Sequence, residues 1–287
     1  MKKLTLLLLL VYGFVSFSQD KKAFNIFTKD GKEISYDKMT KDLAKADFVF
    51  VGELHNNPIS HWLELEITKS LFKAKDGKII QGAEMFEADD QLIIDEFLSG
   101  LYPEKKFEPE MKLWPNYSTD YKPLLMFAKE NNIRFIATNI PRRYASVVYK
   151  KGFEGLEKLS PEAKKYIAPL PIKYDKELDC YKAMMNMGGM PAHANENLPK
   201  SQASKDATMA YFIDKNYVKK HTFVHYEGSY HSDNYQGIVW YLKNVYKHDN
   251  IKTISTVTQE DLSKLNEENL NKADYIIVVT EDMTTTY

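Results

Sequence analysis

The side chains of this sequence that are best suited to chemistry follow short apolar runs. They are two carboxylates, two imidazoles and a guanidinium, namely Glu53, Glu84, His55, His231 and Arg142. If these groups meet, Glu53, His55 and His231 could bind a transition metal. The same groups could instead supply a general base and an orienting acid. His61 is a further candidate, because it lies shortly after the first of these histidines.

These residues depend on strands and helices that alternate along the chain. Residues 48–51 are four apolar residues in a row, two of them valine, which is typical of a buried strand. Helical spacing of apolar residues begins at Ile59. Repeated strand–helix alternation predicts parallel strands joined by crossovers. The carboxyl ends of such strands share one edge of the sheet, where ligands bind in open α/β folds. We therefore expect the polar residues to meet at that edge.

The predicted fold is an α/β domain with a mostly parallel central sheet flanked by helices. Residues from about 144 to 215 have the pattern of helices without a clear strand, which predicts a helical insertion. Within it, Met184–His193 is rich in Met and Gly and could fold over an apolar ligand. The alternative is a flexible surface loop. The strand candidates are residues 48–51, 78–83, 133–138, 222–226, 251–257 and 275–279.

The first eighteen residues have the pattern of a secretory signal peptide. Lys2 and Lys3 precede the apolar run Leu4–Val11, and Ser16-Phe17-Ser18 has small residues where cleavage would occur. The run is too short for a typical spanning helix, although an uncleaved anchor is the alternative. We expect a mature domain of residues 19–287 without a transmembrane segment. It would be exported and lie in the periplasm, at the outer membrane or outside the cell.

The composition narrows the function classes. Residues 1–18 contain two lysines and no acidic residue, so the mature chain has 37 basic and 40 acidic residues. This balance argues against nucleic acid as a partner. Cys180 is the only cysteine, so no internal disulfide can form. The sequence lacks His-Glu-x-x-His, Gly-x-Ser-x-Gly, a P-loop and Gly-x-Gly-x-x-Gly, so it does not indicate a zincin helix, a nucleophile elbow or a dinucleotide site.

Several short motifs occur in an order that a known family shares. They are Gly52-Glu-Leu-His55, Glu84-Met-Phe86, Asn139-Ile-Pro-Arg142, Gln202-Ala203 with Asp206 and Met209-Ala210, and Gly228-Ser-Tyr-His231 with Gly237. Over residues 47–242 the chain resembles the ChaN-like haem-binding family of the wider Tiki and TraB superfamily. The resemblance implies an α/β core with a helical insertion, and haem binding linked to iron uptake. It also implies cofacial haems shared between two subunits of a homodimer. Many members are lipoproteins, but this sequence lacks the lipobox cysteine.

The resemblance leaves the haem ligand and the chemistry open. Haem iron takes a Tyr or His axial ligand, and the segment expected to supply it offers Tyr174, Tyr181 and His193. Arg142 or Arg143 could pair with a propionate. In a second interpretation, which the wider superfamily suggests, the protein is a metal-dependent hydrolase of the peptidase or esterase type. A third is a non-catalytic scaffold.

The hydrolase interpretation assigns a role to each polar residue of the predicted edge. Glu53 or Glu84 would act as base or ligand, and His55 and His231 would hold the metal. Arg142 would stabilise a developing oxyanion.

Overall fold

The computed structural model of the protein describes residues 21–186 and 195–287. Its centre is a seven-stranded sheet with the strand order β1-β7-β6-β2-β5-β3-β4. β1 is antiparallel to β7, and the other neighbouring strands of this sheet run parallel. The predicted α/β fold with a mostly parallel sheet is therefore confirmed. The strands are β1 (Phe24–Thr28), β2 (Phe48–Glu53), β3 (Ile79–Glu87), β4 (Phe135–Asn139), β5 (Thr222–Gly228), β6 (Ile251–Gln259) and β7 (Tyr275–Thr280).

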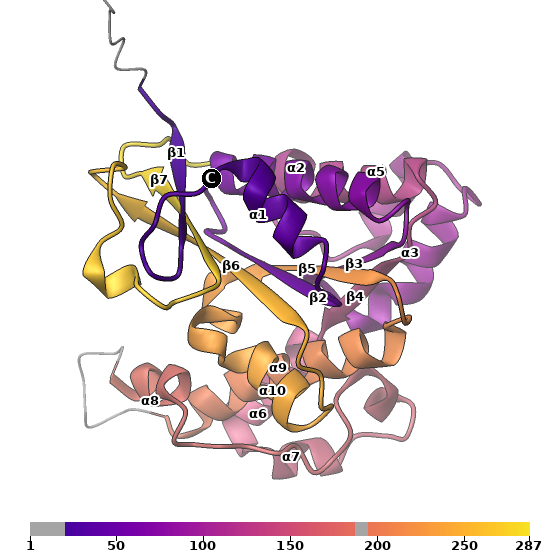
Figure 1. Cartoon of the computed structure of the whole chain (residues 1–287). Helices are drawn as coiled ribbons and strands as arrows, with labels where there is room; N and C mark the ends of the chain where they lie inside the picture. Colours follow the sequence, from indigo (N-terminus) through magenta and orange to yellow (C-terminus); the bar gives the residue numbers. More distant parts are fainter. Residues whose placement is uncertain (1–20, 187–194) are drawn as a thin grey trace, which may run out of the picture.

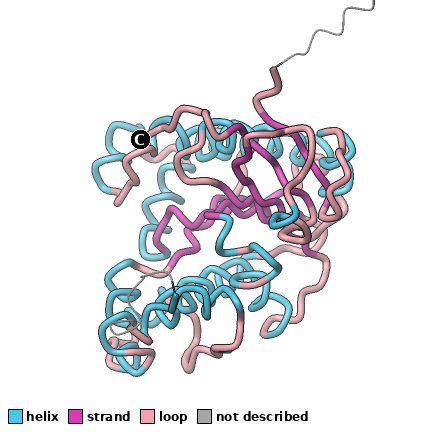
Figure 2. Tube along the Cα trace, turned by 90° about the vertical axis from the view of Figure 1, so that its left-hand side faces the viewer, coloured by secondary structure: helices cyan, strands magenta, loops and turns pink. Residues whose placement is uncertain are grey.

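Helices cover both faces of the sheet (Figure 1). One layer contains α1 to α5, and the other contains α6 to α10. Figure 2 shows the strands between these two layers from the side. The helices of the first layer are α1 (Tyr36–Leu43), α2 (Pro58–Ala74), α3 (Gln91–Leu98), α4 (Glu104–Phe107) and α5 (Lys122–Glu130). Those of the second layer are α6 (Arg142–Lys151), α7 (Glu154–Glu157), α8 (Asp179–Asn186), α9 (Asn197–Asn216) and α10 (Gly237–Asn244).

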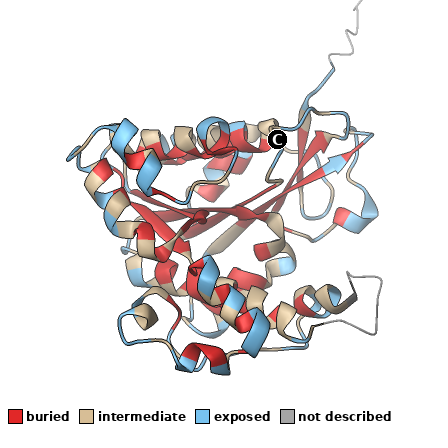
Figure 3. Cartoon of the chain, turned by 180° about the vertical axis from the view of Figure 1, so that it is seen from behind, coloured by how far each residue is buried: buried red, intermediate tan, exposed pale blue. Residues whose placement is uncertain are grey.

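Most of the hydrophobic core lies in two layers of side chains, one on each face of the sheet (Figure 3). β2 contributes side chains to both layers, because successive side chains of a strand point to opposite faces. Val49 and Val51 belong to the core layer that packs against α1 to α5. Phe48 and Phe50 belong to the core layer on the opposite face of the sheet. All six residues of β2 are buried. This is why a parallel strand covered on both faces appears in the sequence as a continuous apolar run.

In the parts that the structure describes, the stretch between β4 and β5 contains helices and loops but no strand. Its longest element, α9, packs against α6, α10 and β4. Ala203, Ala207 and Ala210 are buried on that helix, and their small side chains allow close packing. None of the helices in residues 21–186 and 195–287 combines the length and the apolarity that crossing a membrane requires. The proposed signal peptide and most of the Met–Gly segment, including His193, lie outside these residues.

Candidate functional site

The polar residues predicted from the sequence gather at the carboxyl edge of three adjacent strands. β2 ends at Glu53, which lies opposite Gly228 at the end of β5. β3 carries Glu84 where its register with β4 shifts between Ala83 and Glu87. Such an irregularity can redirect a side chain at the end of a strand. The parallel topology therefore brings the two carboxylates to one edge, as the sequence predicted.

The two Gly-x-x-His motifs pack directly against each other. A Cβ atom on Gly228 would lie 2.6 Å from Nε2 of His55, so the second motif's glycine makes room for the first motif's histidine. A Cβ atom on Gly52 would lie 2.9 Å from Cα of Ser229, which belongs to the second motif. Both glycines are thus needed for close approach of backbone and ring. The repeated pattern reflects a mutual contact between β2 and β5.

His55 is held by a buried carboxylate and reaches a surface. Its Nδ1 lies 2.6 Å from Oε1 of Glu53, and the same oxygen accepts a hydrogen bond from the Tyr121 hydroxyl at 2.8 Å. The His55 side chain is 37% exposed, whereas the Glu53 side chain is fully enclosed. A carboxylate at Nδ1 fixes the orientation of an imidazole and leaves Nε2 for a ligand.

His231 lies in a separate group of buried partners. Its Nε2 is 3.2 Å from Oε1 of Glu84, and its Nδ1 is 2.5 Å from Oδ1 of Asp206 on α9. The hydroxyl of Tyr181 donates to the other oxygen of Asp206 at 2.7 Å. Oε2 of Glu84 accepts the Gly228 backbone N–H at 2.9 Å. His231 therefore bridges β3 and α9 through two carboxylates.

Electrostatics favours charged forms in this group in spite of burial. Burial alone would raise the pKa of Glu84, but the neighbouring charges of His231 and His55 lower it to about 2. Burial alone would lower the pKa of His231, but Glu84 and Asp206 raise it to about 10. For His55, burial is outweighed by Glu53 and Glu84, so its pKa is also raised. Near neutral pH, Glu84 is therefore a carboxylate and His231 an imidazolium.

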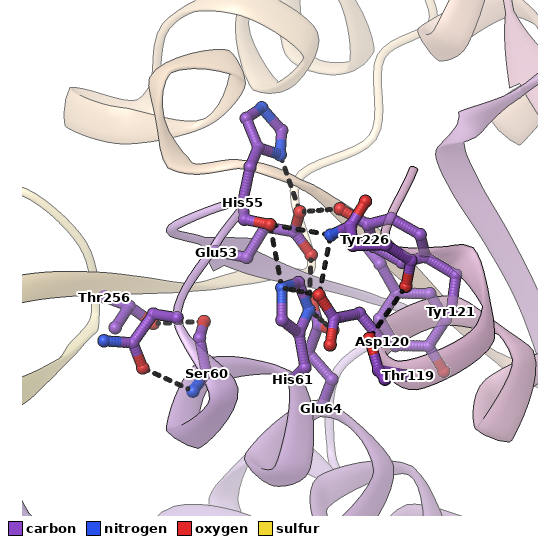
Figure 4. A network of polar contacts seen from close by, with 12 residues as sticks. Glu53, His55, Ser60, His61, Glu64, Thr119, Asp120, Tyr121, Tyr226 and Thr256 are labelled. Atoms are coloured by element: carbon purple, nitrogen blue, oxygen red, sulfur yellow. Dashed lines mark hydrogen bonds and ion pairs between the residues drawn. The ribbon is translucent and has the colours of Figure 1, made fainter. Parts of the chain in front are cut away.

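Behind Glu53 lies a second polar cluster that involves His61 on α2 (Figure 4). Nδ1 of His61 is 3.1 Å from Oε2 of Glu64 and 3.3 Å from Oε2 of Glu53. Its Nε2 is 3.1 Å from the His55 carbonyl oxygen and 3.3 Å from Oδ2 of Asp120. Glu53, His61 and Glu64 have ligand atoms within 4.8 Å of one another and could hold a metal ion. This group shares Glu53 with the metal ligands predicted from the sequence but contains His61 in place of His55 and His231.

A cavity of about 1050 Å³ opens in front of His55 and Glu84. This volume lies just above the usual range for small-molecule and cofactor pockets, about 300–1,000 Å³. Its apolar walls include Met85, Trp114 and Ile140, and several basic side chains line its mouth. The basic residues are Lys112, Arg142, Arg143 and Lys205.

The basic residues at the cavity differ in their partners. Arg143 lies 2.6 Å from Asp89 and stacks over the ring of Tyr144. Lys112 lies 2.9 Å from Glu87. In the described part of the chain, Arg142 and Lys205 make no ion pair or side-chain hydrogen bond. These two cations are therefore available to an anionic ligand.

The aromatic residues proposed as haem ligands do not line this cavity. Tyr181 is 1% exposed and is bonded to Asp206, and the Tyr174 ring lies 5.5 Å from the Tyr181 ring. Tyr149 on α6, in contrast, lines the cavity and is 43% exposed. Tyr149 is not among the residues predicted from the sequence, although it follows Arg142 by seven residues, which is two helical turns and therefore the same face.

Other site residues were also missed. Asp206 lies in one of the family motifs, but its sequence position predicts no role for it. Asp120 and Tyr121 come from a π-helical turn, η3 (Tyr117–Tyr121), which precedes α5. Turns of this kind are common near functional sites. Glu64 could have been found from its spacing, because it lies three residues after His61 on the same helix and so shares its face.

Together, the sheet order and the paired Gly-x-x-His motifs define an α/β protein with a cavity at the carboxyl edge of its sheet. The family described as "Haem-binding uptake, Tiki superfamily, ChaN" matches residues 39–242. The chain therefore belongs to this family, and the resemblance seen in the sequence motifs is confirmed.

Solved structures share the fold at low sequence identity. ChaN of Campylobacter jejuni, described with cofacial haem binding, is 17% identical, with a TM-score of 0.65 over 90% of this chain and 98% of that one. The erythromycin esterase EreC in its open conformation is 9% identical, with a TM-score of 0.51 over the same shares of the two chains.

A curated relative matches a smaller part of the chain. The chloroplastic protein RETICULATA-RELATED 5 of Arabidopsis thaliana is 27% identical over 133 residues. The match covers 44% of this chain but only 18% of that protein, so this chain corresponds to a small portion of its relative.

Proposed function

We propose that the protein binds haem in the cavity beside His55 and Glu84 and serves in haem or iron uptake. The observation that supports this most directly is the cavity itself, which combines apolar walls with Arg142 and Lys205, two cations that form no ion pair with any residue the structure describes. Haem is a flat, apolar ring with two anionic propionates. Membership of a haem-binding uptake family supports the same ligand.

The residues present fit a haem group. Met85, Trp114 and Ile140 offer apolar contact to a ring, and an arginine can bind a carboxylate through two parallel hydrogen bonds. Tyr149 and His55 are the phenol and imidazole that line the cavity, and both groups are axial ligands of haem iron in proteins. Bound haem would supply its iron and its absorbance, while these side chains bind and orient it.

A hemin titration tests this function. Purified protein should give a saturable shift of the Soret band, and Tyr149→Phe or His55→Ala should change the position of the band or weaken binding. Tyr174→Phe, Tyr181→Phe and His193→Ala test the ligands proposed from the sequence. Tyr211→Phe on α9 is the matched control, since Tyr211 does not line the cavity. A wild-type protein with no saturable shift would contradict the proposal.

A hydrolase is the second candidate, and one observation favours it. The buried carboxylate of Glu53 orients His55, which lines the cavity together with Glu84. An imidazole held in this way can act as a general base, and Arg142 could stabilise a developing oxyanion. Turnover of peptide or ester substrates that is lost in His55→Ala and in His231→Asn would support it. The absence of turnover on both classes would argue against it.

We also propose that the chain is exported and cleaved after Ser18. The basic start, the short apolar run and the small residues before the cleavage point support this. Intact mass measurement of protein recovered from the secreted or periplasmic fraction should give a chain that begins at Gln19. Full-length protein retained inside the cell would contradict it.

A further inference from the structure

Four ionisable side chains form a buried cluster between β2, α2 and the turn before α5. Glu53, His61, Glu64 and Asp120 are between 0% and 5% exposed. Figure 4 shows the His61 ring between the three carboxylates, beneath His55. The cluster is separate from the cavity, because among its members none lines the cavity wall. Ligand binding in the cavity therefore does not explain why these four ionisable side chains are buried together.

If all of its carboxyl groups ionise, the charges of this cluster do not balance. With no ion bound, burial and the neighbouring Glu53 raise the pKa of Glu64 and so favour its neutral form. Three carboxylates face a single imidazole, and no lysine or arginine in the described residues forms an ion pair with Glu53, Glu64 or Asp120. Burying uncompensated carboxylates is costly, and buried charges in proteins are generally paired or coordinate a metal. One further positive charge at this place would remove the imbalance.

Two carboxylate oxygens in the cluster are also incompletely satisfied within the described residues, although that of Glu53 lies 3.3 Å from Nδ1 of His61. Among the described residues, Oε2 of Glu53 and Oε1 of Glu64 accept no hydrogen bond although both are enclosed. Buried polar atoms normally have a hydrogen-bond partner, and an exception calls for an ion or a water molecule. Both residues belong to the group whose ligand atoms lie within 4.8 Å of one another.

The spacing of the ligand atoms suits one ion. Metal–ligand bonds of about 2.0–2.2 Å to nitrogen and oxygen place neighbouring ligand atoms about 3.0–3.4 Å apart in tetrahedral or octahedral geometry. Nδ1 of His61 lies 3.1 Å and 3.3 Å from the nearest oxygens of Glu64 and Glu53. An ion could therefore replace the proton on Nδ1 with little movement of these three side chains.

The surroundings orient His61 for this role. Its Nε2 can donate to the carbonyl oxygen of His55 at 3.1 Å, which directs the lone pair of Nδ1 toward Glu53 and Glu64. Asn116 holds this arrangement, because its amide donates to the same carbonyl oxygen at 2.9 Å and to Asp120 at 2.6 Å. Histidines that bind metals usually donate their other ring N–H to a carbonyl or carboxylate in this way.

We propose that Glu53, His61 and Glu64 bind one divalent first-row transition-metal ion behind the haem cavity. One imidazole nitrogen with two carboxylates is a donor set for Mn²⁺, Fe²⁺ or Zn²⁺ rather than for a soft ion such as Cu⁺. Since the other oxygen of Glu53 holds His55 at 2.6 Å, the ion also fixes the orientation of His55 at the cavity. His55 and His231 are not ligands in this site.

Manganese binding tests the site directly and without haem. Chelator-treated protein free of hemin is titrated with Mn²⁺, and the loss of the free-ion signal is followed by electron paramagnetic resonance. We expect one bound ion per chain. Glu64→Gln should lower the affinity at least tenfold. Glu66→Gln is the matched control on the same helix, because Glu66 is partly exposed and pairs with Lys69 at 2.8 Å; this variant should bind as the wild type does.

Further variants distinguish this site from the motif histidines. His231→Asn should leave Mn²⁺ binding unchanged, so loss in His231→Asn with retention in Glu64→Gln would overturn the proposal. If Glu64→Gln does not fold, Asp120→Asn serves instead and should weaken binding about 10–100-fold; unchanged affinity would again overturn it. A wild-type chain that binds no Mn²⁺, even when it is refolded in the presence of Mn²⁺, would also overturn the proposal. None of these outcomes depends on haem binding.

Discussion

Arg142 and Arg143 are neighbours in sequence but have different partners, and this difference decides which one is free for a haem propionate. Arg143 is already paired with Asp89 at 2.6 Å, whereas Arg142 is exposed at the cavity. A hydrogen bond to a charged group contributes about 1.5–3 kcal/mol. We therefore expect Arg142→Ala to weaken hemin binding by about tenfold or more, measured by Soret titration.

The chain offers a matched control for this prediction. Arg134 lies just before β4, at the opposite end of the strand that leads to Arg142, and it contacts Asn216. Arg134→Ala should leave the dissociation constant of hemin unchanged. Equal losses in the two variants would mean that net charge, and not a propionate contact, determines the affinity.

The Glu84–His231 pair makes stability depend on pH. Glu84 and Asp206 overcome burial and raise the pKa of His231 from 6.5 to about 10, so the folded chain holds this proton more tightly than the unfolded chain. The resulting stabilisation is complete below about pH 6.5 and is lost as pH rises toward 10. The pKa of Glu84 is lowered from 4.5 to about 2, so its contribution is present above pH 4.5 and is lost as pH falls toward 2.

Thermal unfolding as a function of pH can measure this pair. The difference in Tm between wild type and Glu84→Gln should be largest between about pH 4.5 and 6.5 and should decrease on both sides. Glu66→Gln, which removes a partly exposed carboxylate, should give a small and nearly constant difference. A constant difference for Glu84→Gln would show that the pair is not ionised in the folded chain.

At the scale of elements, the contact between β2 and β5 depends on a glycine. Gly228 has ordinary backbone angles, so alanine would be restricted only by the His55 ring, which a Cβ atom would approach to 2.6 Å. We expect Gly228→Ala to displace His55 and to destabilise the fold by about 1–3 kcal/mol. Denaturant unfolding measures the loss of stability.

A double-mutant cycle isolates the cause. In a His55→Ala background, Gly228→Ala should cost clearly less, because the other nearby atom, Oε2 of Glu84, lies at an ordinary distance of 3.6 Å. If the cost is the same in both backgrounds, the glycine is required for another reason than room for the imidazole.

The strands and helices also show which parts of the site could be predicted from the sequence. The ends of β2, β3 and β5 could be predicted, because buried parallel strands have continuous apolar runs and share one carboxyl edge. The contact between Asp206 and His231 could not be predicted, because the position of Asp206 depends on the path of α9 across the sheet. Asp120 depends on a π-helical turn, which has no periodic signal in the sequence.

For the molecule as a whole, the shape of the cavity leads us to expect a dimer when haem is bound. It is open on one side, and Tyr149 in its lining is 43% exposed. A haem bound there would leave apolar ring surface in water, and burial of apolar surface is the main driving force of association. A second haem-loaded subunit would cover that surface with its own ring.

Hemin should therefore control the oligomeric state. We expect a monomer without hemin and a dimer at one hemin per chain, measured by light scattering coupled to size-exclusion chromatography. Arg142→Ala should need more hemin to reach the same mass, because dimer formation follows haem occupancy rather than a separate protein contact. A chain that stays monomeric when saturated with hemin would contradict a shared cofacial site and leave each haem to a single subunit. A dimer that forms equally well without hemin would place the interface on a protein surface elsewhere.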